Sequence, residues 1–208
     1  MPGWGQASEG VGVVLPPWPS VCPVRGAVQL RPVEVRDVAM AQELSTDPYV
    51  PLTGSLPGDA TAEEALAWVR RQQGRHAEGR GFSFAIARRS DDRAIGHCGL
   101  WLTEIDEGRA TAGYAIAPSS RGHGHAADAL IALTEFGWTL PGLQRIALLI
   151  EPWNTASLRT AEAAGYVREG KLAGYKEIGG APRDMVVFAA IRPTAIQPTA
   201  ESDSEDGD

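Results

Sequence analysis

A glycine-rich turn between an apolar segment and an amphipathic segment constrains the fold of this chain more than any other feature. Residues 110–117 are apolar and aromatic, as in a buried strand, and residues 118–127 then place Gly122 and Gly124 beside Arg121. Beyond the turn, apolar side chains recur at the spacing of one helix face, at Ala127, Leu130, Ile131, Thr134 and Trp138. The sequence therefore predicts a strand, a glycine turn (residues 118–127) and a helix in direct succession.

Two more apolar segments precede this strand, and short polar turns separate all three. The segments cover residues 82–87 and 94–102, and the connecting turns are Ser90–Arg93 and Asp106–Arg109. Turns this short join antiparallel neighbours, so we expect three consecutive hairpin strands that end at the glycine turn.

Further helices and strands are expected on both sides of this group. Thr61 and Glu64 form a capping-box pattern, in which each side chain binds a free amide at a helix start, and Gly165 suits the end of another helix. The expected helices cover residues 37–46, 61–76 and 154–164, and the further strands cover 28–32, 145–150, 166–175 and 184–191. Together they predict an α+β or mixed α/β fold with a parallel pair at the strand–helix–strand step.

Charge and composition divide the chain into three parts. The 208 residues carry a net charge of −7, which excludes a uniformly basic nucleic-acid binder, and five acids fall in residues 201–208. Residues 1–27 are rich in Gly and Pro without a periodic apolar face. We expect an irregular arm over residues 1–27, a folded domain over 28–192 and a disordered acidic tail over 193–208.

Membrane, targeting and metal signals are missing from the sequence. No apolar run approaches the roughly 20 residues of a membrane helix, and no basic segment precedes a long apolar one near residue 1. Cys22 and Cys98 stand far apart without a metal-ligand spacing, so free thiols and no metal are expected. These observations predict a cytoplasmic protein that contacts no membrane.

The glycine turn has the composition of an anion site. Its glycines allow close backbone approach, the first amides of the helix are free donors, and Arg121 adds a positive charge, which together suit a phosphate or pyrophosphate. A P-loop is excluded because no Gly-Lys-Ser/Thr follows. Gly122, Gly124 and Ala127 fit a dinucleotide-binding turn, but that fold places the turn after the first strand of alternating strands and helices.

Arg121 to Ala126 also fits the pattern Arg/Gln-x-x-Gly-x-Gly/Ala, and further motifs occur in order around it. These are Ile95-Gly-His-Cys-Gly-Leu100, Gly113-Tyr-Ala-Ile-Ala-Pro118, Glu151-Pro-Trp-Asn-Thr-Ala-Ser157 and Ala163-Ala-Gly-Tyr166. On these motifs the block from Val28 to Arg192 resembles the GNAT superfamily of acyl-CoA-dependent N-acyltransferases, and more narrowly the ribosomal-protein N-terminal acetyltransferases of RimJ/RimL type. The resemblance implies a twisted, mostly antiparallel central sheet flanked by helices.

The resemblance implies acetyl-CoA as co-substrate, with its pyrophosphate on the amides of the glycine turn. The cofactor-binding residues that it implies are Ile116, Ala117, Arg121, Gly122, His123, Gly124, His125, Ala126, Asn154 and Ser157. The pantetheine arm is expected along the strand that ends at Ile116 and Ala117. In the family this strand bulges and splays from its neighbour, so that an amide near Ile116 polarises the thioester carbonyl. Asn154, which matches a family donor to pantetheine, also suits a helix N-cap.

For catalysis, the resemblance implies direct attack of a neutral amine on the thioester, which calls for an acid and a base. Ser157 matches the Asn-x-x-Ser spacing of the RimJ/RimL type and is the expected acid, since Ala161 stands where many relatives carry a Tyr. Leu149 stands where some relatives carry a basic carboxylate, which leaves Glu104, Glu151 or a water chain as the base.

The expected acceptor pocket lies between Trp101, Glu104 and Trp153, and Tyr175 and Asp184 are candidates for shaping it. The expected function is transfer of an acetyl group to a primary amine, either of a small molecule or of a protein N-terminus. Two alternatives stay open: a non-catalytic acyl-CoA-binding or interaction module, and an enzyme that uses another acyl-CoA. Family likeness implies a monomer or homodimer.

Overall fold

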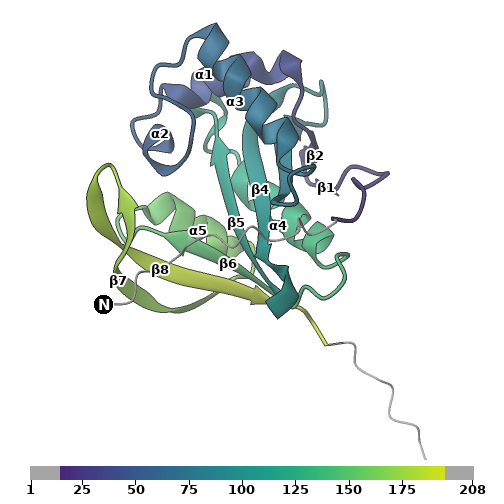
Figure 1. Cartoon of the computed structure of the whole chain (residues 1–208), viewed down its shortest axis with the longest axis vertical. Helices are drawn as coiled ribbons and strands as arrows, with labels where there is room; N and C mark the ends of the chain where they lie inside the picture. The colour runs from purple at the N-terminus through teal and green to yellow at the C-terminus, as the bar shows by residue number, and fades with distance from the viewer. Residues whose placement is uncertain (1–14, 195–208) are drawn as a thin grey trace, which may run out of the picture.

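The computed structural model describes residues 15–194 and contains one eight-stranded sheet (Figure 1). Its strands are β1 (Val24–Arg25), β2 (Val28–Pro32), β3 (Gly81–Arg88), β4 (Ala94–Glu104), β5 (Arg109–Ile116), β6 (Arg145–Ile150), β7 (Val167–Ile178) and β8 (Ala181–Ile191). They lie in the order β1-β2-β3-β4-β5-β6-β8-β7, and within the described residues only β5 and β6 pair in parallel. The expected mostly antiparallel mixed fold is confirmed.

Helices cover both faces of the sheet. On one face, at the top of Figure 1, stand α1 (Val38–Ser45), α2 (Val50–Thr53) and α3 (Ala62–Gly74), and on the other lie α4 (His125–Gly137) and α5 (Thr155–Ala163). Three short 3-10 turns are η1 (Val35–Asp37), η2 (Ile105–Glu107) and η3 (Pro118–Ser120). No helix in the range 15–194 is long and apolar enough to cross a membrane.

Successive side chains of a strand point to opposite faces of the sheet, and helices cover both faces. The central strands are therefore buried on both sides. On β3, Phe84 belongs to the core beneath α4, and its neighbour Ala85 belongs to the core beneath α1 and α3. Both side chains are fully buried. Covering on both faces explains why this strand has a nearly continuous apolar sequence instead of an alternating one.

Local signals at the helix ends operate as expected. The Thr61 hydroxyl accepts from the Glu64 amide at 3.3 Å, and the Glu64 carboxylate accepts from the Thr61 amide at 2.9 Å, which confirms the capping box. Gly165 follows α5 with a φ of +81°. The structure adds β1 and α2 to the expected elements, and it places β8 between β6 and β7.

The expected arm and tail are each described in part. Residues 1–14 of the arm and 195–208 of the tail lie outside the described residues. In the described part of the arm, the Trp18 ring packs edge-on against Phe82 and Phe84, with centroid distances of 5.3 and 5.0 Å. This part of the arm therefore contacts the core beneath α4.

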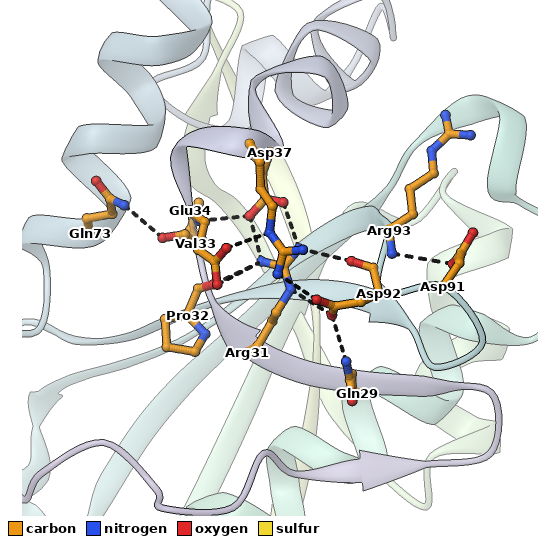
Figure 2. A network of polar contacts seen from close by, with 11 residues as sticks. Gln29, Arg31, Pro32, Val33, Glu34, Asp37, Gln73, Asp91, Asp92 and Arg93 are labelled. Atoms are coloured by element: carbon orange, nitrogen blue, oxygen red, sulfur yellow. Dashed lines mark hydrogen bonds and ion pairs between the residues drawn. The ribbon is translucent and has the colours of Figure 1, made fainter.

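A buried ion-pair network joins β2 to the start of α1 (Figure 2). Arg31 donates two hydrogen bonds of 2.8 Å to the Asp37 carboxylate, and both side chains are almost fully buried. Its Nε donates to Asp92 at 3.0 Å. Burial alone lowers the pKa of Arg31, but the hydrogen bonds and charges of Asp37 and Asp92 raise it, so the guanidinium stays charged. The network anchors the segment that leads into α1 and α2.

Candidate active site

β5 and β6 diverge as they run toward the glycine turn. They pair only from Arg109 with Arg145 to Thr111 with Ala147. Beyond Thr111, β5 stays paired with β4 on its other side, and β6 stays paired with β8. An opening therefore separates the two strands, and we call this opening the slot.

The unpaired edge of β5 turns backbone donors into the slot. The Ala117 amide donates to the Ile95 carbonyl at 2.9 Å, and bonded positions alternate along an antiparallel pair. The amides of Ala112, Tyr114 and Ile116 therefore point away from β4. An extended ligand would bond to them as an added strand does.

The expected splay is present, but the expected bulge is not found along the slot. The register of β4 with β5 is unbroken from Gly96 opposite Ile116 to Trp101 opposite Thr111. The slot therefore opens because β6 diverges, with β5 remaining regular.

A cavity of about 980 Å³ runs along the slot from the glycine turn to the space beneath α3. The predicted cofactor residues that line it are Ile116, Arg121, Gly122, Gly124, His125, Ala126, Asn154 and Ser157. Ala117 is buried beside them, and the exposed His123 stacks on His125 with a centroid distance of 5.5 Å. Residues far apart in the sequence thus meet along one cavity.

The glycine turn presents free donors to this cavity. Gly122 and Gly124 have φ values of +82° and +79°, a conformation that other L-residues rarely adopt. A Cβ at either position would meet no protein atom within 4 Å, so the space above the turn is open. Within the described chain, the five amides from Gly122 to Ala126 have no hydrogen-bond acceptor. Such a row of free donors at a helix start has the geometry that suits an anion.

Arg121 is engaged in two contacts at the mouth of the slot. Its Nε donates to the Ile116 carbonyl at 2.9 Å, and its guanidinium lies 2.7 Å from the Asp47 carboxylate. Asp47 in turn accepts from the amides of Tyr49 and Val50. Arg121 therefore holds the segment between α1 and α2 against the end of β5, in addition to supplying charge beside the turn.

The start of α5 forms the opposite wall. Asn154 Oδ1 accepts from the Ser157 amide at 3.1 Å, so its N-cap function is confirmed and its Nδ2 stays available to the cavity. The Tyr114 hydroxyl donates to the Ser157 carbonyl at 3.3 Å and links β5 to α5 across the slot. Burial raises the pKa of Tyr114, so this hydroxyl keeps its proton.

The two candidate bases occupy different surroundings. Glu151 is 4% exposed and lies 3.9 Å from Arg183. Burial and the nearby Glu151 carboxylate raise the pKa of Tyr49, whose side chain lines the cavity. Glu104 is instead exposed and 3.1 Å from Arg109, at the end of β5 away from the glycine turn.

The end of the cavity where the acceptor is expected is lined largely by residues that sequence reasoning did not select. Tyr49, which packs edge-on against Trp153 at 4.8 Å, and Arg75 line it, along with the predicted Trp101. Tyr175 and Asp184 are not among the lining residues. The side chains contributed by α2 and α3 carried no recognisable motif, and only the chain's path brings them over β4.

A mostly antiparallel sheet that opens beside a glycine turn is the architecture of an N-acetyltransferase. The chain belongs to the GNAT family, because the family model described as acetyltransferase (GNAT) domain matches residues 28–167, more than half of the chain. It is 27% identical over 163 residues to the uncharacterized N-acetyltransferase p20 of Bacillus licheniformis, covering 78% of this chain and 92% of that protein.

Solved structures show the same fold. Mycobacterium smegmatis RimJ in complex with CoA-disulfide has a TM-score of 0.72 and 28% identity, over 84% of this chain and 88% of that chain. The ribosomal-protein-S5-alanine acetyltransferase from Vibrio fischeri has a TM-score of 0.67 and 20% identity, over 83% and 97%. The chain is an N-acetyltransferase of the GNAT family with RimJ- and RimL-type structural neighbours.

Proposed function

We propose that this enzyme binds acetyl-CoA in the slot and transfers the acetyl group to a primary amine, using the domain of residues 28–192. The observation that carries the proposal is the continuity of the cavity from the free amides of the glycine turn to the unpaired edge of β5. The pyrophosphate would bind at the turn and the pantetheine arm along β5, with Asn154 Nδ2 as a further donor. The complex of the relative from Mycobacterium smegmatis with CoA-disulfide supports the cofactor.

The reaction would proceed by direct attack. The neutral amine nitrogen bonds to the thioester carbon, and an amide on the edge of β5 at Tyr114 or Ile116 donates to the developing oxyanion. As the carbon–sulfur bond breaks, the Ser157 hydroxyl donates its proton to the departing thiolate and regains a proton from solvent water, while Glu151 later returns its proton to solvent. Glu151 takes the proton of the amine through the Tyr49 hydroxyl or a water. We favour Glu151 over Glu104 because it lies directly behind a residue of the cavity wall.

Two acceptor types remain within the proposal. The Vibrio fischeri neighbour, a ribosomal-protein-S5-alanine acetyltransferase, favours an amine of a protein as the acceptor. A small-molecule amine is the other type, and a cavity of about 980 Å³ is large enough for it beside pantetheine.

The test compares Ser157→Ala with Thr155→Ala, a change in the same first turn of α5 at a residue outside the cavity wall. The helix cap uses the Ser157 backbone amide, so the Ala variant keeps it. We expect Ser157→Ala to lower kcat at least about 10-fold with unchanged acetyl-CoA affinity, because proton transfer is worth about 10²–10⁴ in rate. Unchanged kcat in this variant would remove Ser157 from the mechanism.

Two measurements distinguish the proposed enzyme from the alternative of a non-catalytic acyl-CoA-binding module. Thiol release is measured with acetyl-CoA and a broad panel of amines and N-terminal peptides, and acetyl-CoA binding is measured by calorimetry. Tight binding without turnover on any amine would favour the binding module. Absence of binding would refute both.

A further inference from the structure

The charges that line the cavity are unbalanced toward positive. Its lining contains the basic side chains Arg75, Arg121, Arg159 and Lys176, whereas Asp47 is its one carboxylate among the described residues. Asp47 is already paired with Arg121. In a chain with a net charge of −7, this is a local reversal of sign. The cofactor phosphates explain a positive charge at the glycine turn, but Arg75 lies at the other end.

Arg75 forms no ion pair with any of the described residues. It follows α3, and its guanidinium stacks over the Trp101 indole with 5.9 Å from Cζ to the ring centroid. Its Nε is buried and makes no hydrogen bond, and no carboxylate within residues 15–194 pairs with it. The nearby Glu78 is committed to Arg80 at 3.2 Å. Burial and the charges of Arg80 and Arg71 lower the pKa of Arg75, and the charge of Glu78 offsets only part of this effect.

Two further polar groups of the same wall lack partners. His97 lies opposite Ala115 on β5 and packs against Trp68, and its buried Nε2 has no hydrogen bond in the described structure. Burial and the charge of Arg75 hold the pKa of His97 at about 3, so its ring is neutral. Gln72 uses its Oε1 to accept from the Ser83 hydroxyl, which leaves its Nε2 as a donor.

The position of Arg75 relative to the slot follows from two glycines. A Cβ at Gly113 on β5 would lie 2.9 Å from the Trp101 ring, and one at Gly99 would lie 3.1 Å from it. The indole therefore covers both strands at this level, and Arg75 lies over the indole and lines the same cavity as Gly113. A group bound by Arg75 would belong to a molecule that approaches the thioester from the α3 side.

We infer that the acceptor is an amine that also carries an acid group, a carboxylate or a phosphate, and that Arg75, held by Trp101, binds this acid with help from Gln72. The inference rests on the proposed function and narrows its acceptor. A purely cationic acceptor such as a polyamine would meet Arg75 and Lys176, and the one carboxylate of the described cavity wall, Asp47, is already paired with Arg121. An acid group supplies the hydrogen-bond acceptors that this cluster of donors lacks.

The experiment uses matched acceptors that differ only in the acid. The pairs are a C-terminally amidated tetrapeptide with N-terminal Ser followed by Asp or Asn, and free glutamine or its α-amide glutaminamide, with spermidine as the cationic comparison. The wild-type enzyme should acetylate the acid member about 10- to 100-fold more efficiently in kcat/KM, the range expected for hydrogen bonds to a charged group. Spermidine should be the poorest acceptor. A preference within the peptide pair identifies a peptide as the source of the acid. A preference within the amino-acid pair identifies a free amino acid.

Variants of Arg75 test whether this side chain causes the preference for the acid member of each pair. Arg75→Gln should reduce the acid-to-amide ratio to about one, and Arg75→Lys should restore part of it through KM. Arg70→Gln is the matched control, because Arg70 lies on the same helix α3, is exposed and does not line the cavity. It should keep the wild-type ratio.

Binding of the same peptides to protein loaded with non-reactive desulfo-CoA separates this inference from the proposed function. Efficient acetylation with a ratio of one in the wild type would overturn the acid group and leave the acetyltransferase function standing. A binding preference for the acid peptide that disappears in Arg75→Gln, without turnover on any amine, would support the acid site and refute catalysis. The absence of both turnover and a binding preference would overturn the inference and the proposed function together.

Discussion

Replacement of Gly124 by Ala tests the anion site of the glycine turn most directly. Gly124 has a φ of +79°, and the added Cβ would meet no protein atom within 4 Å. The change therefore disturbs no packing inside the protein and acts in two ways only. It forces an L-residue into the left-handed region, which costs about 1–2 kcal/mol of stability, and it puts a methyl group into the space where a ligand would approach the free amides.

A second glycine isolates the first of these effects. Gly165, after α5, has a φ of +81°, an equally open Cβ position and no place in the cavity wall. Gly165→Ala should therefore lose the same 1–2 kcal/mol in urea unfolding and keep its ligand affinity. Only Gly124→Ala should also lose the contact of the amides with pyrophosphate.

The expected loss of affinity follows from the hydrogen bonds at stake. One hydrogen bond to a charged group is worth about 1.5–3 kcal/mol, so Kd for acetyl-CoA should rise about 10- to 150-fold in Gly124→Ala. Isothermal titration calorimetry of both variants and the wild type gives the comparison. Equal affinities in the two variants would mean that the turn does not hold the cofactor phosphates.

Three further changes probe the fold and the acceptor side. Arg31→Gln should lower the free energy of unfolding by about 3–5 kcal/mol in urea, because it leaves a buried carboxylate unpaired, whereas the exposed control Arg36→Gln should change it far less; similar effects would contradict the network. His97→Gln should flatten the decline in stability between pH 6.5 and 4, since the folded pKa of about 3 lies below the unfolded value and the unfolded state takes up the extra proton; parallel pH curves would exclude this assignment. Gly113→Ala should raise KM for the amine with little change in acetyl-CoA affinity, because its Cβ must displace the Trp101 ring; a selective loss of cofactor affinity would speak against this geometry.

Much of the fold follows from local sequence signals. The continuous apolar run of β3 and the capping box of Thr61 depend on neighbouring residues and elementary geometry, so their positions could be predicted. Asn154 is a similar case, since an Asn before a helix start caps it whatever surrounds the helix. The glycine turn likewise combines positive φ values with free amides in adjacent residues.

The candidate site was predictable only where its chemistry is local. Glu104 and Glu151 look equally suitable in the sequence, yet one is exposed beside Arg109 and the other is buried next to Tyr49. The pairing of Arg121 with Asp47 joins residues that no spacing rule relates. Burial and partner choice depend on the chain's path, which short-range patterns do not encode.

The sequence by itself determined most of the helices and strands, the donors of the glycine turn and the membership of the acetyltransferase class. The tertiary structure alone decided how wide the slot opens and what surrounds it, because β6 leaves β5 to follow β8, and α3 carries Arg75 over Trp101. A turn or a helix cap is specified by residues only a few positions apart in the sequence. The charge of an acceptor pocket is a sum over side chains that only folding brings together.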